Sequence, residues 1–257
     1  MGYAEFELDI PAVMRRELPM YFDAMEASPL TEESIRNEVT DGAQGAYLLY
    51  LGDQLVYVGK TDSQVGFRSR LSRHLKFVSH RHNIDPADVR FKAVRIFVFS
   101  NFDLEAMLIE EYTKRNDARP VWNYSGFGSN DPGRNRERQD PADFDLEFPV
   151  DIDREVKFLP PGEHTLLDAV LALKANLPYI FRYGTGGAHW RRGHEAMSDV
   201  TIRVLEGPVT TRQALMLVLG GLPDEWRATV LPNRVILYPE RDDANYPGQV
   251  EALRRQP

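Results

Sequence analysis

Two short motifs that join a tyrosine to a glycine constrain this sequence more than any other feature. The first is Gly45-Ala46-Tyr47, and the second, ten residues later, is Tyr57-Val58-Gly59. Each lies in a run rich in β-forming residues, at 46–51 and 55–59, and Gly52-Asp53-Gln54 between the runs favours a tight turn. The sequence therefore predicts a β-hairpin that carries one tyrosine on each strand.

A basic pair follows the hairpin in a segment with helical periodicity. Apolar residues recur at helical spacing over 66–78, and Arg70 and His74 are four residues apart within it. Residues one helical turn apart emerge on the same face, so we expect the two side chains to lie together. Residues 89–99 then read as a third strand.

A glutamate and an asparagine complete the set of polar residues. Ser100 and Asp103 form a Ser-x-x-Asp signal for a helix that runs to about Lys114. Glu105 lies near its start in the apolar run 104–109, where a carboxylate needs a partner. Asn123 ends the segment Pro-Val-Trp-Asn just beyond this helix.

These residue types suit the hydrolysis of a phosphodiester bond. The reaction needs an activated water, compensation of charge on the phosphate and stabilisation of the leaving oxygen. A tyrosine beside positive charge can act as a base, because the charge favours the phenolate. An arginine binds phosphate bidentately, and a single carboxylate suits Mg²⁺, which keeps much of its hydration shell. Taken singly, each residue has a plainer interpretation as a packed aromatic, a surface pair or a solvated glutamate, and only the combination favours catalysis.

The combined motifs resemble those of the GIY-YIG nuclease superfamily over roughly residues 44–138. The resemblance implies an α+β fold with a three-stranded antiparallel sheet flanked by helices, and Mg²⁺ or Mn²⁺ bound by Glu105. Ala46 stands where the family has isoleucine, a change that removes no functional group. The catalytic residues that the resemblance implies are Tyr47, Tyr57, Arg70, His74, Glu105 and Asn123.

One branch of the superfamily is especially similar. The segment 125–134 resembles the loop after Pro-Leu-Trp-Asn in the type II restriction endonucleases that cut CCGCGG, and that branch shares the Arg-x-x-x-His spacing. This chain has a shorter hairpin loop and an unmatched C-terminal region. We therefore expect a DNA endonuclease of restriction-modification or phage defence. A repair or mobile-element nuclease remains an alternative, as does a module that binds DNA or protein without cutting.

The charge pattern is mixed for a protein whose expected partner is DNA. The net charge is −8, whereas phosphate binding usually leaves a basic footprint. Basic residues nevertheless gather between residues 60 and 82 and again near 134–138. Extra residues near 64–66 make Arg68 a competitor for the role of Arg70. The residues predicted to contact DNA are Lys60, Arg68, Arg73, Lys76, Arg134 and Arg136.

The composition of the chain limits the kinds of site and the cellular location that we expect for the protein. The absence of cysteine excludes disulfides and thiolate metal sites. No apolar run approaches the roughly 20 residues that span a bilayer, and the N-terminus lacks a basic start followed by an apolar core. We therefore expect a cytoplasmic protein without a membrane partner.

The chain is long enough for one large domain or two small ones. We expect an N-terminal helical region at 1–43, the nuclease domain at 44–139, a Pro- and Asp-rich linker at 140–154 and an α/β domain at 155–257. In the last, Thr165–Pro178 and Thr210–Pro223 repeat one pattern of a capped amphipathic helix. The role of this domain stays open, as do a homodimer and a protein partner or ligand.

Overall fold

A computed structural model describes residues 2–3, 5, 9–61, 65–97, 103–128, 137–240 and 245–255. The chain divides into two compact units. Unit 1 comprises Met1–Val78 and Asp85–Gly128, and unit 2 comprises Ser79–Ile84 and Ser129–Pro257. Both units combine helices with sheets, so the mixed α+β class is confirmed.

Unit 1 is built on one antiparallel sheet in the order β1-β4-β2-β3. The predicted hairpin is present, because β2 (Gly45–Leu51) pairs with β3 (Gln54–Lys60). On its other side β2 pairs with β4 (Val89–Arg95), which follows the short 3-10 helix η1 (Pro86–Asp88). The two-residue strand β1 (Ser28–Pro29) was not predicted, and it leaves β3 at the opposite edge of the sheet.

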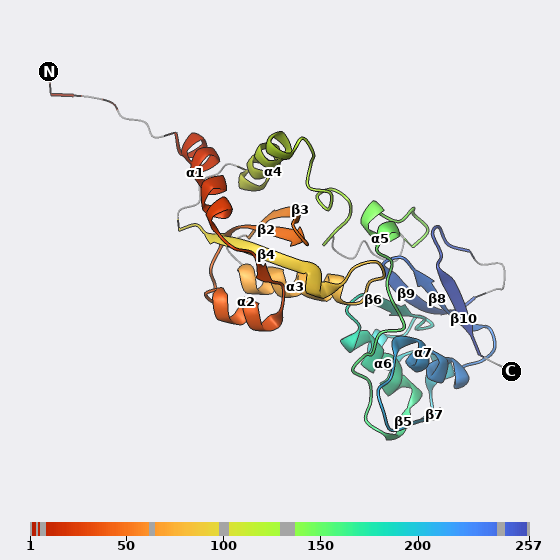
Figure 1. The fold of residues 1–257 in the computed structure, drawn as a ribbon. Coiled ribbons are helices and arrows are strands. Elements are labelled where there is room, and N and C mark those ends of the chain that lie inside the picture. Colours follow the sequence, from red (N-terminus) through yellow and green to blue (C-terminus); the bar gives the residue numbers. More distant parts are fainter. Residues whose placement is uncertain are drawn as a thin grey trace. The chain divides into compact units, whose positions relative to one another are not determined.

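Four helices cover the two faces of this sheet, with α1 and α4 on one side and α2 and α3 on the other (Figure 1). Because side chains alternate along a strand, Ala46, Leu48 and Val58 point to one face and pack in the core with residues of α1 and α4. The tyrosines of both motifs point to the α3 face. The helices are α1 (Ile10–Ala24), α2 (Glu32–Glu38), α3 (Phe67–Ser79) and α4 (Leu104–Asn116).

The predicted start of α4 differs from the observed one. Ser100, the expected first cap, lies outside the described residues. The helix begins at Leu104, and its N-cap is Asp103, whose carboxylate accepts a hydrogen bond from the backbone N–H of Ala106 at 3.3 Å. An aspartate at the N-cap accepts from one of the free N–H groups of the first turn, so no serine is needed at this position. Glu105 is therefore placed in that first turn.

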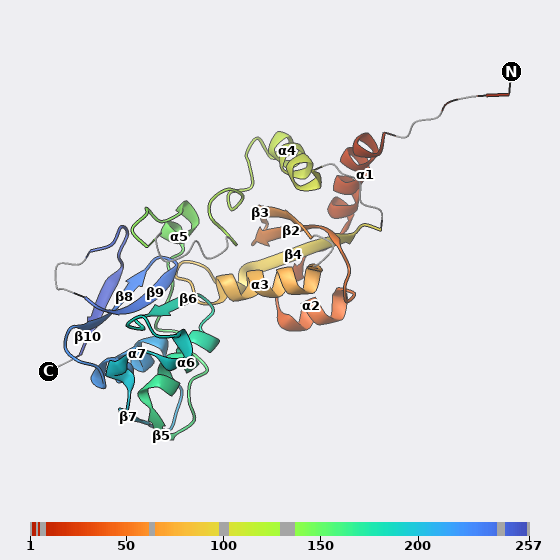
Figure 2. The same cartoon turned by 180° about the vertical axis from the view of Figure 1, so that it is seen from behind.

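Unit 2 contains a mixed sheet in the order β10-β8-β9-β6, and α6 and α7 lie side by side against it (Figure 2). Thr165 and Thr210 cap these two helices through their hydroxyls, so the repeated helical pattern is confirmed. β5 and β7 form a separate antiparallel pair. The elements are α5 (Asp143–Glu147), β5 (Gly162–Thr165), α6 (Leu166–Asn176), β6 (Ile180–Tyr183), η3 (Trp190–Arg192), η4 (Glu195–Met197), β7 (Thr201–Val204), α7 (Thr211–Gly220), β8 (Trp226–Leu231), β9 (Arg234–Pro239) and β10 (Glu251–Arg254).

The segment predicted as a linker, 140–154, packs into unit 2 instead. Phe144, Phe148, Val150 and Ile152 are buried, and the last two belong to the main core of the unit. The apolar residues of this segment are separated by prolines and aspartates and follow neither helical nor strand periodicity. The composition of residues 140–154 therefore indicated a linker, although the segment contributes residues to the core.

A short segment after α3 explains why the two units alternate along the chain. Arg81 is 2% exposed, and its guanidinium donates to the carboxylate of Asp145 at 2.9 Å and to the carbonyl oxygen of Phe148 at 2.8 Å. A buried guanidinium is tolerated only when it is paired and its donors are satisfied. Ser79–Ile84 therefore belongs to unit 2 although unit 1 residues precede and follow it.

Candidate active site

The two tyrosine-glycine motifs form one packed structure on the β2–β3 hairpin. Tyr47 lies opposite Gly59 in the strand register, and its ring passes over that glycine. A Cβ atom added to Gly59 would lie 2.4 Å from the hydroxyl oxygen of Tyr47, and one on Gly45 would lie 2.0 Å from the carbonyl oxygen of Val94. Both glycines are therefore required by close approach, and Gly59 leaves room for the ring of Tyr47, which is buried with 1% exposure.

His74 of α3 packs against both tyrosines. Its Nε2 atom lies 2.8 Å from the hydroxyl oxygen of Tyr47, and both residues are buried. The ring of Tyr57 lies 5.3 Å from the imidazole, and Phe127 stacks on the imidazole with a centroid distance of 4.9 Å and an interplanar angle of 12°. Phe127 was not predicted, because it lies in a glycine-rich loop with no periodic pattern.

Asn123 is bound to the free edge of β3. Its Oδ1 atom accepts from the backbone N–H of Val58 at 2.8 Å, and its Nδ2 atom donates to the carbonyl oxygen of the same residue at 2.9 Å. The neighbouring backbone N–H of Trp122 donates to the carbonyl oxygen of Val56 at 2.8 Å. The loop after α4 thus satisfies backbone groups that an edge strand would otherwise leave open.

Glu105 lies near the end of β3. The backbone N–H of Lys60 helps to lower the pKa of the Glu105 carboxyl, while the side chain of Lys60 pairs with Asp103 at 2.8 Å. Burial raises the pKa of Glu105, and the positive charges of Lys60 and Arg70 oppose this shift. The carboxylate is therefore half-buried and close to the tyrosine cluster, without an ion pair to its own oxygens among the described residues.

The structure separates the two competing arginines. Arg68 donates from Nε to the carbonyl oxygen of Val39 at 2.8 Å and from Nη2 to that of Arg36 at 2.9 Å, so it binds the end of α2. Arg70 instead acts electrostatically on both tyrosines and on Glu105. Its Nε atom is buried and has no hydrogen-bond partner among the residues described. Arg70, and not Arg68, therefore belongs to the cluster.

The ionisation of the cluster is dominated by burial. Burial raises the pKa of Tyr47 and of Tyr57, the negative charge of Glu105 raises both further, and Arg70 opposes these shifts. Burial also lowers the pKa of His74 to about 3, helped by the charges of Arg70 and Arg73. At neutral pH the imidazole is therefore uncharged and can share a proton with Tyr47.

The remaining residues predicted to contact DNA have varied surroundings. Arg73 donates to the carbonyl oxygen of Gly128 at 2.8 Å, and Lys76 is exposed on α3. Arg134 and Arg136 lie outside the described residues. The cations placed nearest to the tyrosines are thus Arg70 and Arg73.

The single carboxylate of Glu105 fits a divalent cation that keeps most of its water ligands, rather than a cation whose ligands all come from the protein. Among the residues that the structure describes, no group of three histidine, aspartate or glutamate residues could hold a metal ion. Mg²⁺ keeps several waters and is commonly bound through only one or two carboxylates. Because burial disfavours the charged form of Glu105, a cation at this position would also stabilise its carboxylate.

In the described part of the chain, no helix has the length and apolar character needed to cross a membrane. A comparison of the sequence with protein-family models finds no match, and a comparison with curated proteins finds none either.

The buried histidine predicts a specific dependence of stability on pH. Because the pKa of His74 is about 3 in the folded protein and 6.5 is its ordinary value, the unfolded chain binds one more proton between these values. This contribution to stability is complete above pH 6.5 and is lost as the pH falls. Between pH 7 and pH 5 it should amount to about 2 kcal/mol.

Urea unfolding of the wild type and of His74→Gln at pH 7, 6 and 5 measures this contribution. The free energy of unfolding should fall more steeply for the wild type, so the difference between the proteins shrinks as the pH is lowered. Equal slopes for both proteins would mean that His74 is not held in its neutral form.

Proposed function

We propose that this protein is a metal-dependent DNA endonuclease of the GIY-YIG superfamily, which hydrolyses phosphodiester bonds in restriction or phage defence. The proposal depends on one observation above all. Side chains from four separate segments converge around the hairpin, and they are the residue types that the chemistry requires: Tyr47, Tyr57, Arg70, His74, Glu105 and Asn123.

The architecture of unit 1 supports the same proposal. The order of elements is hairpin, helix, strand and helix, and the sheet strands β2, β3 and β4 are antiparallel. The two tyrosine-glycine motifs occupy adjacent strands, and the helix with Arg70 and His74 covers their tyrosine face. This arrangement agrees with the fold that the motif resemblance implies.

The chain's own residues divide the chemistry between them. Tyr57 is more accessible than Tyr47, so its side-chain oxygen, once deprotonated to the phenolate, is the group placed to remove a proton from water. The hydroxyl of Tyr47 bonds to His74, and the Tyr47 ring lies 6.1 Å from the Tyr57 ring, so this buried packing positions Tyr57. Arg70 binds the phosphate. Asn123 fixes the edge of β3 next to these groups.

Glu105 is the residue that would hold the Mg²⁺ or Mn²⁺. A cation there would supply positive charge for the leaving oxygen and would offset the Glu105 charge that raises the pKa of Tyr57. Because the pKa of Tyr57 is raised, its hydroxyl stays protonated and the site is inactive until the charge of Glu105 is compensated.

Glu105→Gln should abolish cleavage, with a loss of about 10³-fold or more, because it removes the charge that binds the metal. The assay is relaxation and linearisation of supercoiled plasmid with Mg²⁺, with Mn²⁺ and with a chelator. Glu110→Gln is the matched control, since Glu110 lies on the same helix but forms exposed ion pairs with Arg15 and Lys114. It should cut like the wild type.

If the Glu105→Gln variant cleaves near the wild-type rate, Glu105 is not the residue that binds the metal. A wild-type protein that binds DNA but cuts no plasmid under any of these conditions would support the non-cutting module instead. A repair or mobile-element nuclease would share the metal dependence and differ in its target.

Arg70→Ala and Arg68→Ala should fail in different ways. Arg70→Ala should lose cleavage but keep its stability, because its guanidinium holds no other element in place. Arg68→Ala should keep much of its cleavage rate per folded molecule but lower the free energy of unfolding by about 1–2 kcal/mol, since charged hydrogen bonds to two carbonyl groups are removed. Plasmid cleavage and urea unfolding of both variants provide the comparison. The reverse pattern would show that the catalytic arginine is Arg68.

A further inference from the structure

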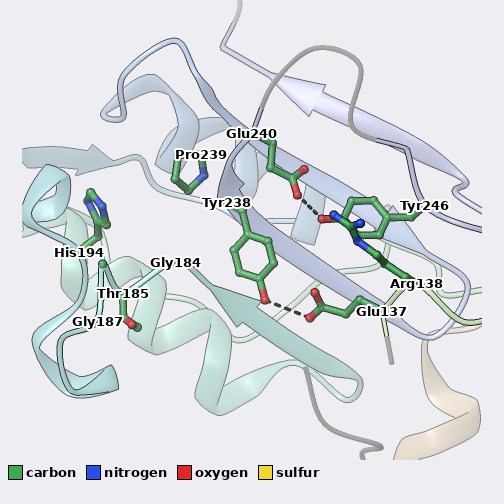
Figure 3. A pocket seen from close by; sticks show the side chains of 11 residues that line it. Glu137, Arg138, Gly184, Thr185, Gly187, His194, Tyr238, Pro239, Glu240 and Tyr246 are labelled. Carbon is green, nitrogen blue, oxygen red and sulfur yellow. Dashed lines mark hydrogen bonds between the residues drawn. The ribbon is translucent and has the colours of Figure 1, made fainter. Parts of the chain in front are cut away.

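Unit 2 contains a cavity of about 680 Å³ that the proposed nuclease chemistry does not use (Figure 3). It lies where two parallel neighbours, β6 and β9, end, so the loop after β6 and the last residues of β9 both line it. In open α/β sheets, ligands commonly bind beyond the carboxyl ends of the parallel strands, and β6 and β9 form one such parallel pair. The volume is also within the range of small-molecule sites, about 300–1,000 Å³.

Two carboxylates in the cavity wall already have their charge balanced. Each accepts a hydrogen bond from a tyrosine hydroxyl and pairs with an arginine: Tyr238 and Arg182 for Glu137, and Tyr246 and Arg227 for Glu240. The wall is therefore unsuited to a free cation. A carboxylate has about four lone-pair positions, however, so both can accept further hydrogen bonds from N–H or O–H groups of a ligand.

The opposite wall is a fixed glycine turn. Gly186 and Gly187 have φ values of 58° and 88°, and the N–H of Ala188 donates to the carbonyl oxygen of Thr185 at 2.9 Å. Such a turn, with two positive φ angles, strongly favours glycine. A Cβ atom on Gly186 would lie 2.9 Å from Cδ2 of His194, so the turn is packed against the imidazole.

His194 presents a hydrogen-bond donor at this wall. Its Nδ1 atom accepts from the backbone N–H of Ala196 at 3.0 Å, so the neutral ring carries its proton on Nε2. The ring also packs edge-on against Trp226, at a centroid distance of 5.1 Å. Its position is therefore set before any ligand binds.

Arg138 provides a positive charge on the other side. Arg138 lines the cavity together with Glu137 and Tyr246, and in Figure 3 the ring of Tyr238 lies between it and the side with His194 and Gly187. No described residue forms an ion pair with Arg138, in contrast to Arg182 and Arg227. The cavity therefore combines a cation, aromatic rings, acceptor oxygens and one donor.

We propose that this cavity binds a nucleoside phosphate. The phosphate binds Arg138, the base packs against the ring of Tyr238, and N–H or O–H groups of the base and sugar donate to Glu137 and Glu240. A nucleotide is a small ligand with an anion, an aromatic face and several donors, and each of these has a counterpart in the wall. This site is separate from the proposed nuclease centre and does not depend on it.

Calorimetric titration of the full-length chain tests the proposal. The ligands are AMP, GMP, CMP and UMP, each compared with its nucleoside and with inorganic phosphate. At least one nucleotide should bind at least tenfold more tightly than either of its parts. A trinucleotide with and without a 5′-phosphate then distinguishes a free nucleotide from the end of a strand as the source of the ligand.

Three variants locate the binding. Arg138→Ala should weaken it tenfold or more, because a charge-assisted contact to the phosphate is lost. Arg203→Ala, an exposed arginine on β7 outside the cavity, should bind like the wild type. Weaker nucleotide binding in Arg70→Ala with wild-type binding in Arg138→Ala would place the ligand at the proposed nuclease site instead of this cavity.

Three results would overturn the proposal: no binding of any nucleotide at 5 mM, a nucleoside that binds as tightly as its nucleotide, or an Arg138→Ala protein with wild-type affinity.

Discussion

The free edge of β3 is the constraint on which the rest of unit 1 depends. An edge strand exposes N–H and C=O groups that must find partners, and a buried group without one costs about 1–3 kcal/mol. Here Trp122 and Asn123 supply the partners for Val56 and Val58 along that edge, and Glu105 lies near the backbone N–H of Lys60. The contacts that complete the sheet therefore also place an amide beside Tyr57, so stability and the geometry of the candidate site have one origin.

The tyrosine-glycine motifs have a steric explanation that complements this edge. Gly59 has no side chain because the ring of Tyr47 occupies the space of its Cβ, and the buried ring can then reach His74. Burial of the aromatic cluster leaves its tyrosines and its histidine uncharged at neutral pH, with Arg70 nearby as the compensating cation. An acidic chain can thus contain a locally positive site, since net charge does not describe the surroundings of two or three buried groups.

Local patterns in the sequence predicted the hairpin, the helix with Arg70 and His74, and both capped helices of unit 2, because strand alternation, turn residues and caps act over few residues. Features that depend on contacts between residues far apart in the sequence could not be predicted from local patterns. The choice between Arg68 and Arg70 required the position of the end of α2, and Phe127 had no periodic pattern to reveal its stacking on His74. The predicted linker was wrong for the same reason, and the cavity of unit 2 is assembled from segments far apart in sequence.

Amide hydrogen exchange, resolved by residue, tests the role of the β3 edge most directly. The amide of Val58 should exchange as slowly as amides at the centre of β2, because Asn123 protects it, although β3 is an edge strand. In Asn123→Ala the amide of Val58 should lose that protection, while the amides at the centre of β2 keep theirs. Fast exchange of Val58 in the wild-type protein, at the rate of an open edge strand, would contradict the account.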